Sequence, residues 1–452
     1  MSARIETEAG PNPVRPLALL AGTDATRPLA WRRGVPVPAA VFAADVAQLA
    51  AALPSAAYVV NLCEDRYRFL VAFCAAAVAG QTNLLPPSRA PQAVADVLQA
   101  YPRSYVLSDA AVASTSARVF VMADPASTPA TPMSRLPDID ANHVVAIGFT
   151  SGSTGAPKAN PKTWGAVCAS SAFNAALLCG AGAAHIVATV PPQHMYGLEM
   201  SVLLPLRSAA SIHAGHPFFP ADVAAALAAV PAPRLLVTTP FHLRALMQDG
   251  AALPTVAAIV SATAPLDVAL ARAAEERYRT DVVEVFGSTE TCVIAHRRTA
   301  REDAWQLYDG VELHPQPDGT LVSAPYFAAP TLLQDVVELL PERRFLLRGR
   351  NSDLLEIAGK RASLGELTRR LLAIPGVEDG VVFQQEPDAN GVARLAALAV
   401  APGLRETDIA SALRAAIDPV FLPRPLRLIA ALPRNGAGKL PREDLLRALR
   451  DP

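Results

Sequence analysis

The stretch from Phe149 to Lys158 reads F-T-S-G-S-T-G-A-P-K, and it directly follows the apolar, β-branched run that starts at Val144. Glycines allow a backbone to approach a bound anion closely, and successive backbone N–H groups form an anion-binding nest. The hydroxyl groups of the stretch and the ammonium group of Lys158 add further donors. This combination predicts a cradle for a triphosphate at the end of a strand. A Ser/Gly-rich surface loop is the alternative, but the Pro-Lys ending and the preceding strand argue against it.

The spacing of the stretch argues against a Walker A loop, which requires G-x-x-x-x-G-K-[ST] at the start of a helix. Two residues separate Gly155 from Lys158, and Ala159 follows the lysine. A P-loop kinase or ATPase is therefore disfavoured.

The composition of the 452-residue chain indicates a globular protein with more than one domain. Hydrophobic residues make up 51% and the formal net charge is −1, which argues against a disordered chain, a nucleic-acid-binding protein and a polybasic membrane anchor. Five cysteines, an odd number without a C-x-x-C pair, favour reduced thiols over disulfides or a zinc site. The first 16 residues lack the apolar core of a signal peptide. The longest apolar run, Phe69 to Gly80, is shorter than the roughly 20 residues of a membrane helix. We therefore expect a cytoplasmic protein without a membrane span.

Lysine is rare in this chain: only Lys158, Lys162, Lys360 and Lys439 occur among 40 basic residues. A surface charge can be either basic residue, so a lysine retained here indicates a need for a compact ammonium group. Chance is the alternative for any single lysine.

Short apolar runs alternate with helical stretches along the first 300 residues, which predicts an α/β fold with mostly parallel sheets flanked by helices. In such sheets ligands bind at the carboxyl ends of the strands. We expect a large N-terminal domain over residues 1–349, a hinge at residues 350–353, and a small, mobile α+β domain over residues 354–452. The expected strands begin at Ala57, Val144, His185, Arg234, Val256 and Val282, and the expected helices include Pro38 to Leu53, Arg66 to Ala79, Pro220 to Val230 and Leu266 to Arg279.

The stretch from Thr150 to Lys158 resembles the phosphate loop T-S-G-S-T-G-x-P-K of the adenylate-forming enzymes, a superfamily that includes acyl- and aryl-CoA synthetases, adenylation domains of nonribosomal peptide synthetases and firefly luciferase. Every fixed position of that loop matches. The resemblance implies that Lys158 contacts phosphate during catalysis. It also implies that the residues before it hold ATP: Thr150, Ser151, Gly152, Ser153, Thr154 and Gly155.

The stretch V-F-G-S-T-E-T, residues 285–291, is similar to the superfamily's Y-G-x-T-E motif. The resemblance implies that Phe286 and Gly287 lie against adenine, that Thr289 contacts the α-phosphate, and that Glu290 binds Mg²⁺. An aromatic ring stacks on a base, and a carboxylate suits Mg²⁺ beside phosphates. A helix N-cap would explain Ser288 and Thr289 equally well.

The stretch S-A-T-A-P-L, residues 261–266, resembles the superfamily's G-G-A-P-L turn, which implies that Ala264 and Pro265 flank adenine. Ala262 and Thr263 replace its two glycines. The segment P-P-Q-H-M-Y-G, residues 191–197, resembles the one that lines the acid pocket. Its counterparts here are His194, Met195 and Tyr196, joined by Ser261 and Ala262, although a lone histidine is often structural.

Motifs of the last third of the chain complete the resemblance. Asp335 occupies the place of the residue that binds ribose, and Arg350 opens a hinge motif and would contact the nucleotide. The hinge itself falls at Ser352 and Asp353.

Two further motifs follow the expected hinge. Gly359 and Lys360 lie in the stretch I-A-G-K-R-A-S-L-G-E, residues 357–366, which resembles the run that lines the thiol tunnel of the superfamily. The stretch L-P-R-N-G-A-G-K-L-P-R, residues 432–442, resembles the loop that delivers a catalytic lysine, here Lys439. Three of the four lysines thus fall inside these motifs, and Lys162 does not.

The resemblance implies an enzyme that uses ATP and Mg²⁺ to convert a small carboxylic acid to an acyl-AMP and passes the acyl group to a phosphopantetheine thiol. The segments 61–69 and 83–88 resemble ligases of aryl-polyene and xanthomonadin-type pigment pathways. That similarity implies a hydroxybenzoate-like acid and an acyl carrier protein as acceptor. The alternatives are an acyl- or aryl-CoA synthetase that uses free CoA, a luciferase-like oxygenase, and a nucleotide-binding homologue without activity.

Overall fold

The computed structural model describes residues 16–450, apart from residues 113–117, 124–135, 152–156, 181, 317–318, 351–353, 358–359, 387–393 and 436–437. The chain divides into two compact units. The first comprises the residues up to 302 together with 325–328, and the second comprises residues 303–324 and those from 329 onward.

The first sheet of the first unit is parallel except at one edge. Its strand order is β10-β9-β5-β4-β6-β7, and β10 runs antiparallel to β9. Val60, Leu84 and Ile147 of this sheet share a buried cluster with Val94 and Val97 of helix α3. The strands are β4 (Tyr58–Asn61), β5 (Thr82–Leu85), β6 (Ser104–Ser108), β7 (Val119–Val121), β9 (Val144–Ser151) and β10 (Pro157–Thr163), and α3 is Pro91–Ala100.

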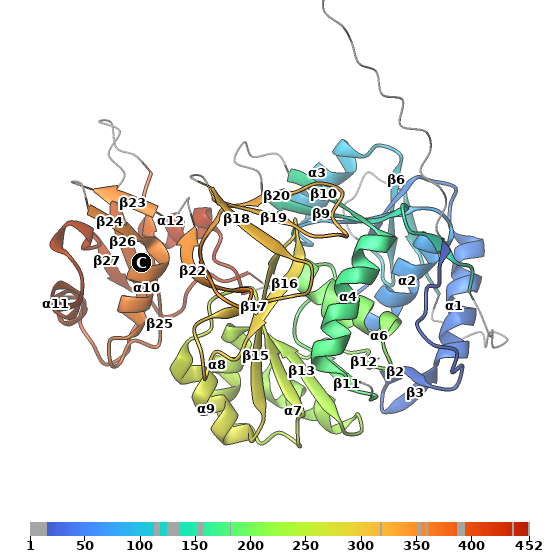
Figure 1. The fold of residues 1–452 in the computed structure, drawn as a ribbon, viewed down its shortest axis with the longest axis horizontal. Coiled ribbons are helices and arrows are strands. Elements are labelled where there is room, and N and C mark those ends of the chain that lie inside the picture. Colours follow the sequence, from blue (N-terminus) through green and yellow to red (C-terminus); the bar gives the residue numbers. More distant parts are fainter. Residues whose placement is uncertain are drawn as a thin grey trace, which may run out of the picture. The chain divides into compact units, whose positions relative to one another are not determined.

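The second sheet of this unit has the order β16-β15-β14-β13-β11-β12-β2-β3. Strands β15 to β2 in that order are parallel, so the carboxyl ends of β11, β13, β14 and β15 lie at one edge. Helices α7, α8 and α9 cover one face, where Val223, Leu243 and Ala271 join the buried cluster of the sheet (Figure 1). The bounds are β2 (Pro28–Arg32), β3 (Val35–Pro38), β11 (His185–Ala188), β12 (Ser211–His213), β13 (Arg234–Thr238), β14 (Ala258–Ser261), β15 (Asp281–Ser288), β16 (Cys292–Arg297), α7 (Pro220–Ala228), α8 (Pro240–Asp249) and α9 (Val268–Tyr278).

Helix α2 (Arg66–Val78) is the apolar run noted in the sequence, and it is a buried helix, as expected. Two buried asparagines fix it to the first sheet. Asn61 Nδ2 donates to the Phe69 carbonyl at 3.0 Å, and Asn83 Nδ2 donates to the Phe73 and Val145 carbonyls, both at 3.1 Å. Both asparagines belong to the segments that suggested a pigment-pathway ligase, and in this structure they have a structural role.

Arg66, at the start of α2, is fully buried and connects the helix to the second sheet. Its guanidinium donates to Ser201 Oγ at 2.6 Å and to the Ala188 and Val190 carbonyls at 3.0 and 2.8 Å. Burial lowers the pKa of Arg66 to about 9. These bonds hold the chain where it leaves β11, immediately before the predicted acid-pocket segment. The other helices of the unit are α1 (Ala39–Ala52), α4 (Trp164–Leu178), α5 (Met195–Leu198) and α6 (Leu204–Arg207), with a π-helical turn at Glu199–Leu203.

The second unit contains three small antiparallel arrangements and a mixed sheet near its end. In the mixed sheet, β26 pairs antiparallel with β25 and parallel with β27. Alternate residues of β26 face opposite sides: Leu395 and Ala397 join a cluster with α10 and α11, whereas Ala396 and Leu398 join one with α12. The bounds are β17 (Trp305–Leu307), β18 (Glu312–Gln316), β19 (Gly319–Ser323), β20 (Thr331–Leu333), β21 (Asp335–Leu340), β22 (Arg344–Arg350), β23 (Leu354–Ile357), β24 (Lys360–Ser363), α10 (Leu364–Leu372), β25 (Asp379–Gln384), β26 (Leu395–Val400), α11 (Glu406–Ala416), β27 (Leu426–Leu428) and α12 (Arg442–Arg450).

The predicted fold class is confirmed, and the expected strands and helices occur within a few residues of their predicted bounds. Strand β22 continues through Gly349 and Arg350, because they pair with Val336 and Asp335, so Arg350, the first residue of the expected hinge, lies at the end of a strand. The expected hinge residues Ser352 and Asp353 lie outside the described residues, so the domain boundary stays a prediction.

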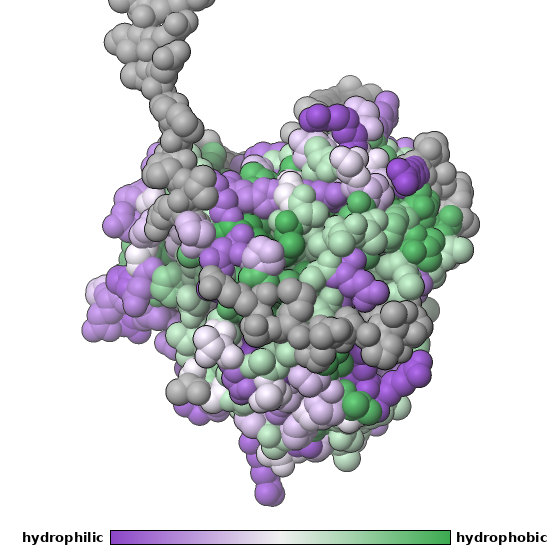
Figure 2. All heavy atoms as spheres, turned by 90° about the vertical axis from the view of Figure 1, so that its right-hand side faces the viewer, coloured by the Kyte–Doolittle hydropathy of each residue, from purple (hydrophilic) through white to green (hydrophobic). Residues whose placement is uncertain are grey.

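Among the described residues, no helix has the length and apolar character needed to cross a membrane. The face in Figure 2 carries polar and apolar residues interspersed.

Buried His242 of the first unit predicts that stability falls in acid. Burial lowers the pKa of His242 to about 4. The unfolded chain takes up this proton near pH 6.5 and the folded chain only near pH 4, so unfolding gains favour as the pH falls between those values. We expect a loss on the order of 2–3 kcal/mol from this histidine, seen in urea unfolding between pH 7.5 and 4.5. His242→Gln should flatten this dependence, whereas His314→Gln, at a half-exposed site, should not; equal slopes in both variants would contradict the assignment.

Candidate active site

The phosphate loop connects two paired antiparallel strands, β9 and β10. Strands β9 and β10 are antiparallel, with Thr150 opposite Lys158. Asn160 Nδ2 donates to the Lys158 carbonyl at 3.1 Å and to Thr150 Oγ1 at 3.3 Å, so it bridges the two strands below the turn. The preceding strand is confirmed, but the second strand was not expected. Gly152, Ser153, Thr154 and Gly155 lie outside the described residues, as does the side chain of Ser151.

The predicted adenine and phosphate motif begins at the end of β15 and continues into a tight turn. The turn is closed by Ser288 Oγ, which accepts from the backbone N–H groups of Glu290 and Thr291 at 3.1 and 3.2 Å. Gly287 permits the close pairing of β15 with β16, because a Cβ there would lie 2.1 Å from the Cys292 carbonyl oxygen. Phe286, Thr289 and Glu290 are all partly exposed at this turn. The helix N-cap alternative is wrong, because the chain enters strand β16.

Gly148 brings three predicted groups together. A Cβ built on Gly148 would lie 2.8 Å from Thr289 Cγ2 and 3.4 Å from Met195 Cε. The phosphate hairpin, the Thr289–Glu290 turn and the acid-pocket segment therefore meet at one residue of β9. The first sheet supplies the hairpin and the second sheet supplies the other two.

The turn that resembles an adenine-flanking loop follows β14. Thr263 has φ +81°, a left-handed conformation that a β-branched residue rarely adopts and that glycine adopts freely. The turn keeps the glycine-like backbone despite the substitution. Buried Glu284 fixes it by accepting from the Leu266 N–H at 3.1 Å. Ala264 is half-buried and Pro265 is exposed.

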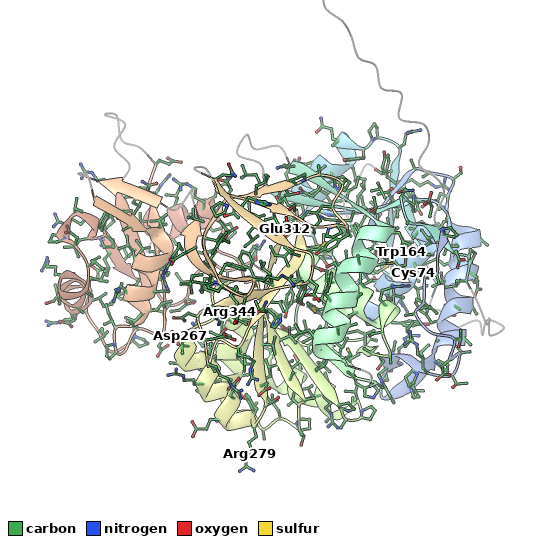
Figure 3. The ribbon with its side chains drawn as sticks, in the orientation of Figure 1. Cys74, Trp164, Asp267, Arg279, Glu312 and Arg344 are labelled. Atoms are coloured by element: carbon green, nitrogen blue, oxygen red, sulfur yellow. The ribbon has the colours of Figure 1, made fainter. Side chains whose placement is uncertain are left out.

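Helix α9 begins directly after this turn. Asp267 caps it by accepting from the Leu270 N–H at 3.0 Å. Figure 3 shows Asp267 near the first turn of α9 and Arg279 at the opposite end, pointing away from the fold. The cap therefore fixes where the helix starts and, with Glu284, sets the position of the preceding turn.

The predicted acid-pocket residues come together at the carboxyl ends of β11 and β14. The Tyr196 hydroxyl donates to the Val260 carbonyl at 2.9 Å, which joins α5 to the strand that ends at Ser261. His194 precedes α5 and is half-buried. Met195 Sδ lies 3.9 Å from Cys292 Sγ. The Ser261 hydroxyl is buried and has no hydrogen-bond partner among the described residues.

The second unit carries the remaining predicted site residues. Asp335 is buried on β21, directly opposite Arg350 of β22, so the two candidate nucleotide contacts are neighbours. The side chain of Arg350 and all of Gly359 lie outside the described residues.

The lysine loop of the second unit is held by a half-buried ion pair. Arg434 donates through Nε and Nη2 to the Asp379 carboxylate at 2.8–3.1 Å and through Nη1 to the Gly438 carbonyl at 3.0 Å. Asn435 Oδ1 accepts from the Lys439 N–H at 3.0 Å. Lys439 is exposed at the end of this loop. A two-pronged Arg–carboxylate pair fixes orientation as well as distance.

The sequence profile of the AMP-binding enzyme family matches residues 39–315. This chain belongs to the AMP-binding enzyme family. Members bind ATP or AMP and activate acids, and this chain is an adenylate-forming enzyme of the acid–thiol ligase type.

Relatives of this AMP-binding enzyme include a 4-coumarate–CoA ligase from Rhodobacter capsulatus. It is 31% identical over 301 residues, which span 65% of this chain and 74% of the relative. ATP-bound MatB from Rhodopseudomonas palustris has a similar structure, with a TM-score of 0.80 at 20% identity over 95% of this chain and 97% of the other. The o-succinylbenzoate CoA synthetase from Bacillus subtilis, solved with its acyl-adenylate, gives 0.79 at 18% identity over 94% and 95% of the two chains. The similarity to these two solved structures establishes that this chain has the same fold as they do.

Several residues of the AMP-binding enzyme that organise the site were not predicted. Gly148 and Glu284 lie outside the motifs, and the motif that contains Arg434 does not report the bonds of this side chain to Asp379 and Gly438. Lys162 was noted only as the lysine outside the motifs, and its rarity in an arginine-rich chain was the available signal. The sequence did not indicate a role for Glu199, because the hydrogen-bond partners of a carboxylate in an apolar segment cannot be predicted from sequence.

Gly148→Ala should reduce adenylate formation more than stability, because the added methyl group displaces Thr289. We expect acid-dependent ATP–pyrophosphate exchange to fall by about tenfold or more, and stability by about 1–3 kcal/mol. Gly403→Ala is the matched control, since a Cβ there has no neighbour within 4 Å. Exchange unchanged in Gly148→Ala would show that the hairpin and the Thr289 turn do not act together.

Proposed function

We propose that this enzyme joins a small carboxylic acid, a hydroxybenzoate-like aryl acid, to AMP and then transfers the acyl group to a phosphopantetheine thiol of an acyl carrier protein. The contact at Gly148 carries the proposal. A phosphate hairpin and an acid-pocket segment that meet at one residue hold two reactants within reach of each other, and such positioning is a large part of catalysis.

In the first step a carboxylate oxygen of the acid attacks the α-phosphorus of ATP, and the bond from that phosphorus to pyrophosphate breaks. A carboxylate is already a nucleophile, so this step needs no general base. The proposal assigns Lys158 and the hairpin turn to the phosphates, Thr289 to the α-phosphate and Lys439 to the charge that develops there. Preorganised donors of this kind contribute about 3–4 kcal/mol each.

Glu290 fits a role as ligand to Mg²⁺. The ion keeps several waters and takes one or two carboxylates together with substrate phosphates. Glu290 is a single partly exposed carboxylate next to Thr289, and the described residues include no cluster of three metal-ligating side chains. When bound, the ion neutralises phosphate charge.

In the second step the thiol sulfur attacks the acyl carbon, and the bond to AMP breaks. We propose that the C-terminal domain rotates about Ser352 and Asp353, that Lys439 leaves, and that the Gly359 segment lines the thiol path. Two states are required because the lysine loop and the thiol path serve successive steps. Free CoA is the second candidate acceptor, favoured by the names of the 4-coumarate–CoA and sulfoacetate–CoA ligases among the relatives.

Lys439→Ala should abolish adenylate formation and leave thiolation of a supplied adenylate within about threefold of wild type. The lysine serves only the step in which the α-phosphorus gains charge. ATP–pyrophosphate exchange measures the first step, and thioester formation from synthetic acyl-AMP measures the second. Arg414→Ala removes an exposed cation from the same unit and should change neither. Equal loss of both steps in Lys439→Ala would count against two states.

A screen of benzoates, cinnamates and fatty acids in the exchange assay should identify the acid, with hydroxylated aryl acids the best. The buried Ser261 hydroxyl is the group we expect to bind the ring hydroxyl. Ser261→Ala should therefore cost about tenfold for a hydroxylated acid and little for the matching acid without the hydroxyl. Equal effects on both acids would remove Ser261 from specificity, and absence of exchange with every acid would favour the non-catalytic alternative.

A further inference from the structure

Lys162 is buried on β10, the strand that leaves the phosphate loop. Only 6% of it is exposed. Lys158, Asn160 and Lys162 alternate along the strand and therefore share one face. The ammonium group of Lys162 donates to the backbone carbonyl of Glu290. The strand that presents Lys158 to the phosphates thus also holds the backbone of the candidate metal ligand.

Glu199 is the buried carboxylate that accompanies Lys162. It opens the π-helical turn after α5 and is 1% exposed. Both its oxygens accept from the Val293 N–H, at 3.0 and 3.1 Å, and Oε1 also accepts from Ser170 Oγ at 2.7 Å and Asn174 Nδ2 at 3.4 Å. Ser170 and Asn174 lie one turn apart on α4, so that helix is tied to the same carboxylate.

The two side chains hold the chain on either side of the turn's last residue, Thr291. Lys162 binds the turn at Glu290, and Glu199 binds Val293, three residues later and the second residue of β16. Burial raises the pKa of Glu199, and the positive charge of Lys162 acts in the opposite direction. The same ammonium also opposes the raised pKa of the Cys292 thiol, at the first residue of β16.

We propose that Lys162 and Glu199 are positioning residues that set the Thr289–Glu290 turn for the triphosphate of ATP. This inference rests on the proposed function of that turn. Two buried groups of opposite charge are by themselves weak evidence for stability, because the cost of desolvating them offsets their attraction, and apolar residues often replace such groups without loss. The hydrogen bond from Lys162 to Glu290 gives the lysine a use that an apolar side chain lacks, because an apolar side chain leaves the Glu290 carbonyl without this donor.

Two variants separate positioning from packing. Glu199→Gln keeps an acceptor oxygen for the Val293 N–H and removes the charge. Lys162→Met added to Glu199→Gln then removes the donor to Glu290 while leaving no buried charge unpaired. The measurements are the dissociation constant for ATP with Mg²⁺ by calorimetry, ATP–pyrophosphate exchange, thiolation of a supplied adenylate, and the urea midpoint.

Compared with Glu199→Gln, the double variant should have a dissociation constant for ATP that is at least about tenfold higher. Its rate of ATP–pyrophosphate exchange should be lower by a similar factor. Thiolation and the urea midpoint should stay close to those of Glu199→Gln.

Unchanged ATP affinity, or equal losses in ATP affinity, thiolation and urea midpoint, would overturn the inference. If wild type binds ATP but exchanges with no acid, the proposed function fails, and the ATP affinities still decide the role of the pair. If the double variant does not fold, Lys162→Gln, which retains a donor, should bind ATP more tightly than Lys162→Met; equal affinities would again overturn it.

Discussion

The close approach of β9 to the Thr289 turn is the constraint on which the rest of this site depends. No side chain fits between Gly148 and Thr289, so the backbone of the phosphate hairpin lies directly against the turn that ends β15. Gly287 is a second position where a side chain would not fit, because the backbone before the same turn passes close to the backbone of Cys292. Contacts made by backbone are less adjustable than contacts made by flexible side chains, and rigid support suits a site that must place several groups around one phosphate.

Buried polar groups maintain this arrangement. Arg66 holds the end of β11, Glu284 holds the turn after β14, and Glu199 holds the start of β16. Each is a charged side chain that bonds both to at least one backbone group and to other side chains. Loops do not pair their own N–H and C=O groups as helices and sheets do. One buried charged side chain that makes several hydrogen bonds can therefore hold several such segments in place at once. The second unit uses the same device, since Arg434 joins the lysine loop to Asp379.

Sequence reasoning located the motifs but did not show how they pack. The hydroxyl- and glycine-rich stretch before Lys158 was identifiable because its chemistry is local. Its setting was not, because the second strand, Pro157–Thr163, contains two prolines and two lysines and does not read as a strand. Thr263 shows the reverse case: its residue type argues against a tight turn, yet Glu284 and the cap of α9 enforce the left-handed backbone.

The sequence by itself determined the α/β class, the order of the strands and helices, and the family, because hydrophobic periodicity and short motifs act between residues close along the chain. Tertiary structure alone decided that Lys162 and Glu199, 37 positions apart, hold one turn, and that Gly148 must lack a side chain. These features depend on which backbone atoms come within a few ångströms of one another when two sheets pack, and no local pattern of residues encodes that distance.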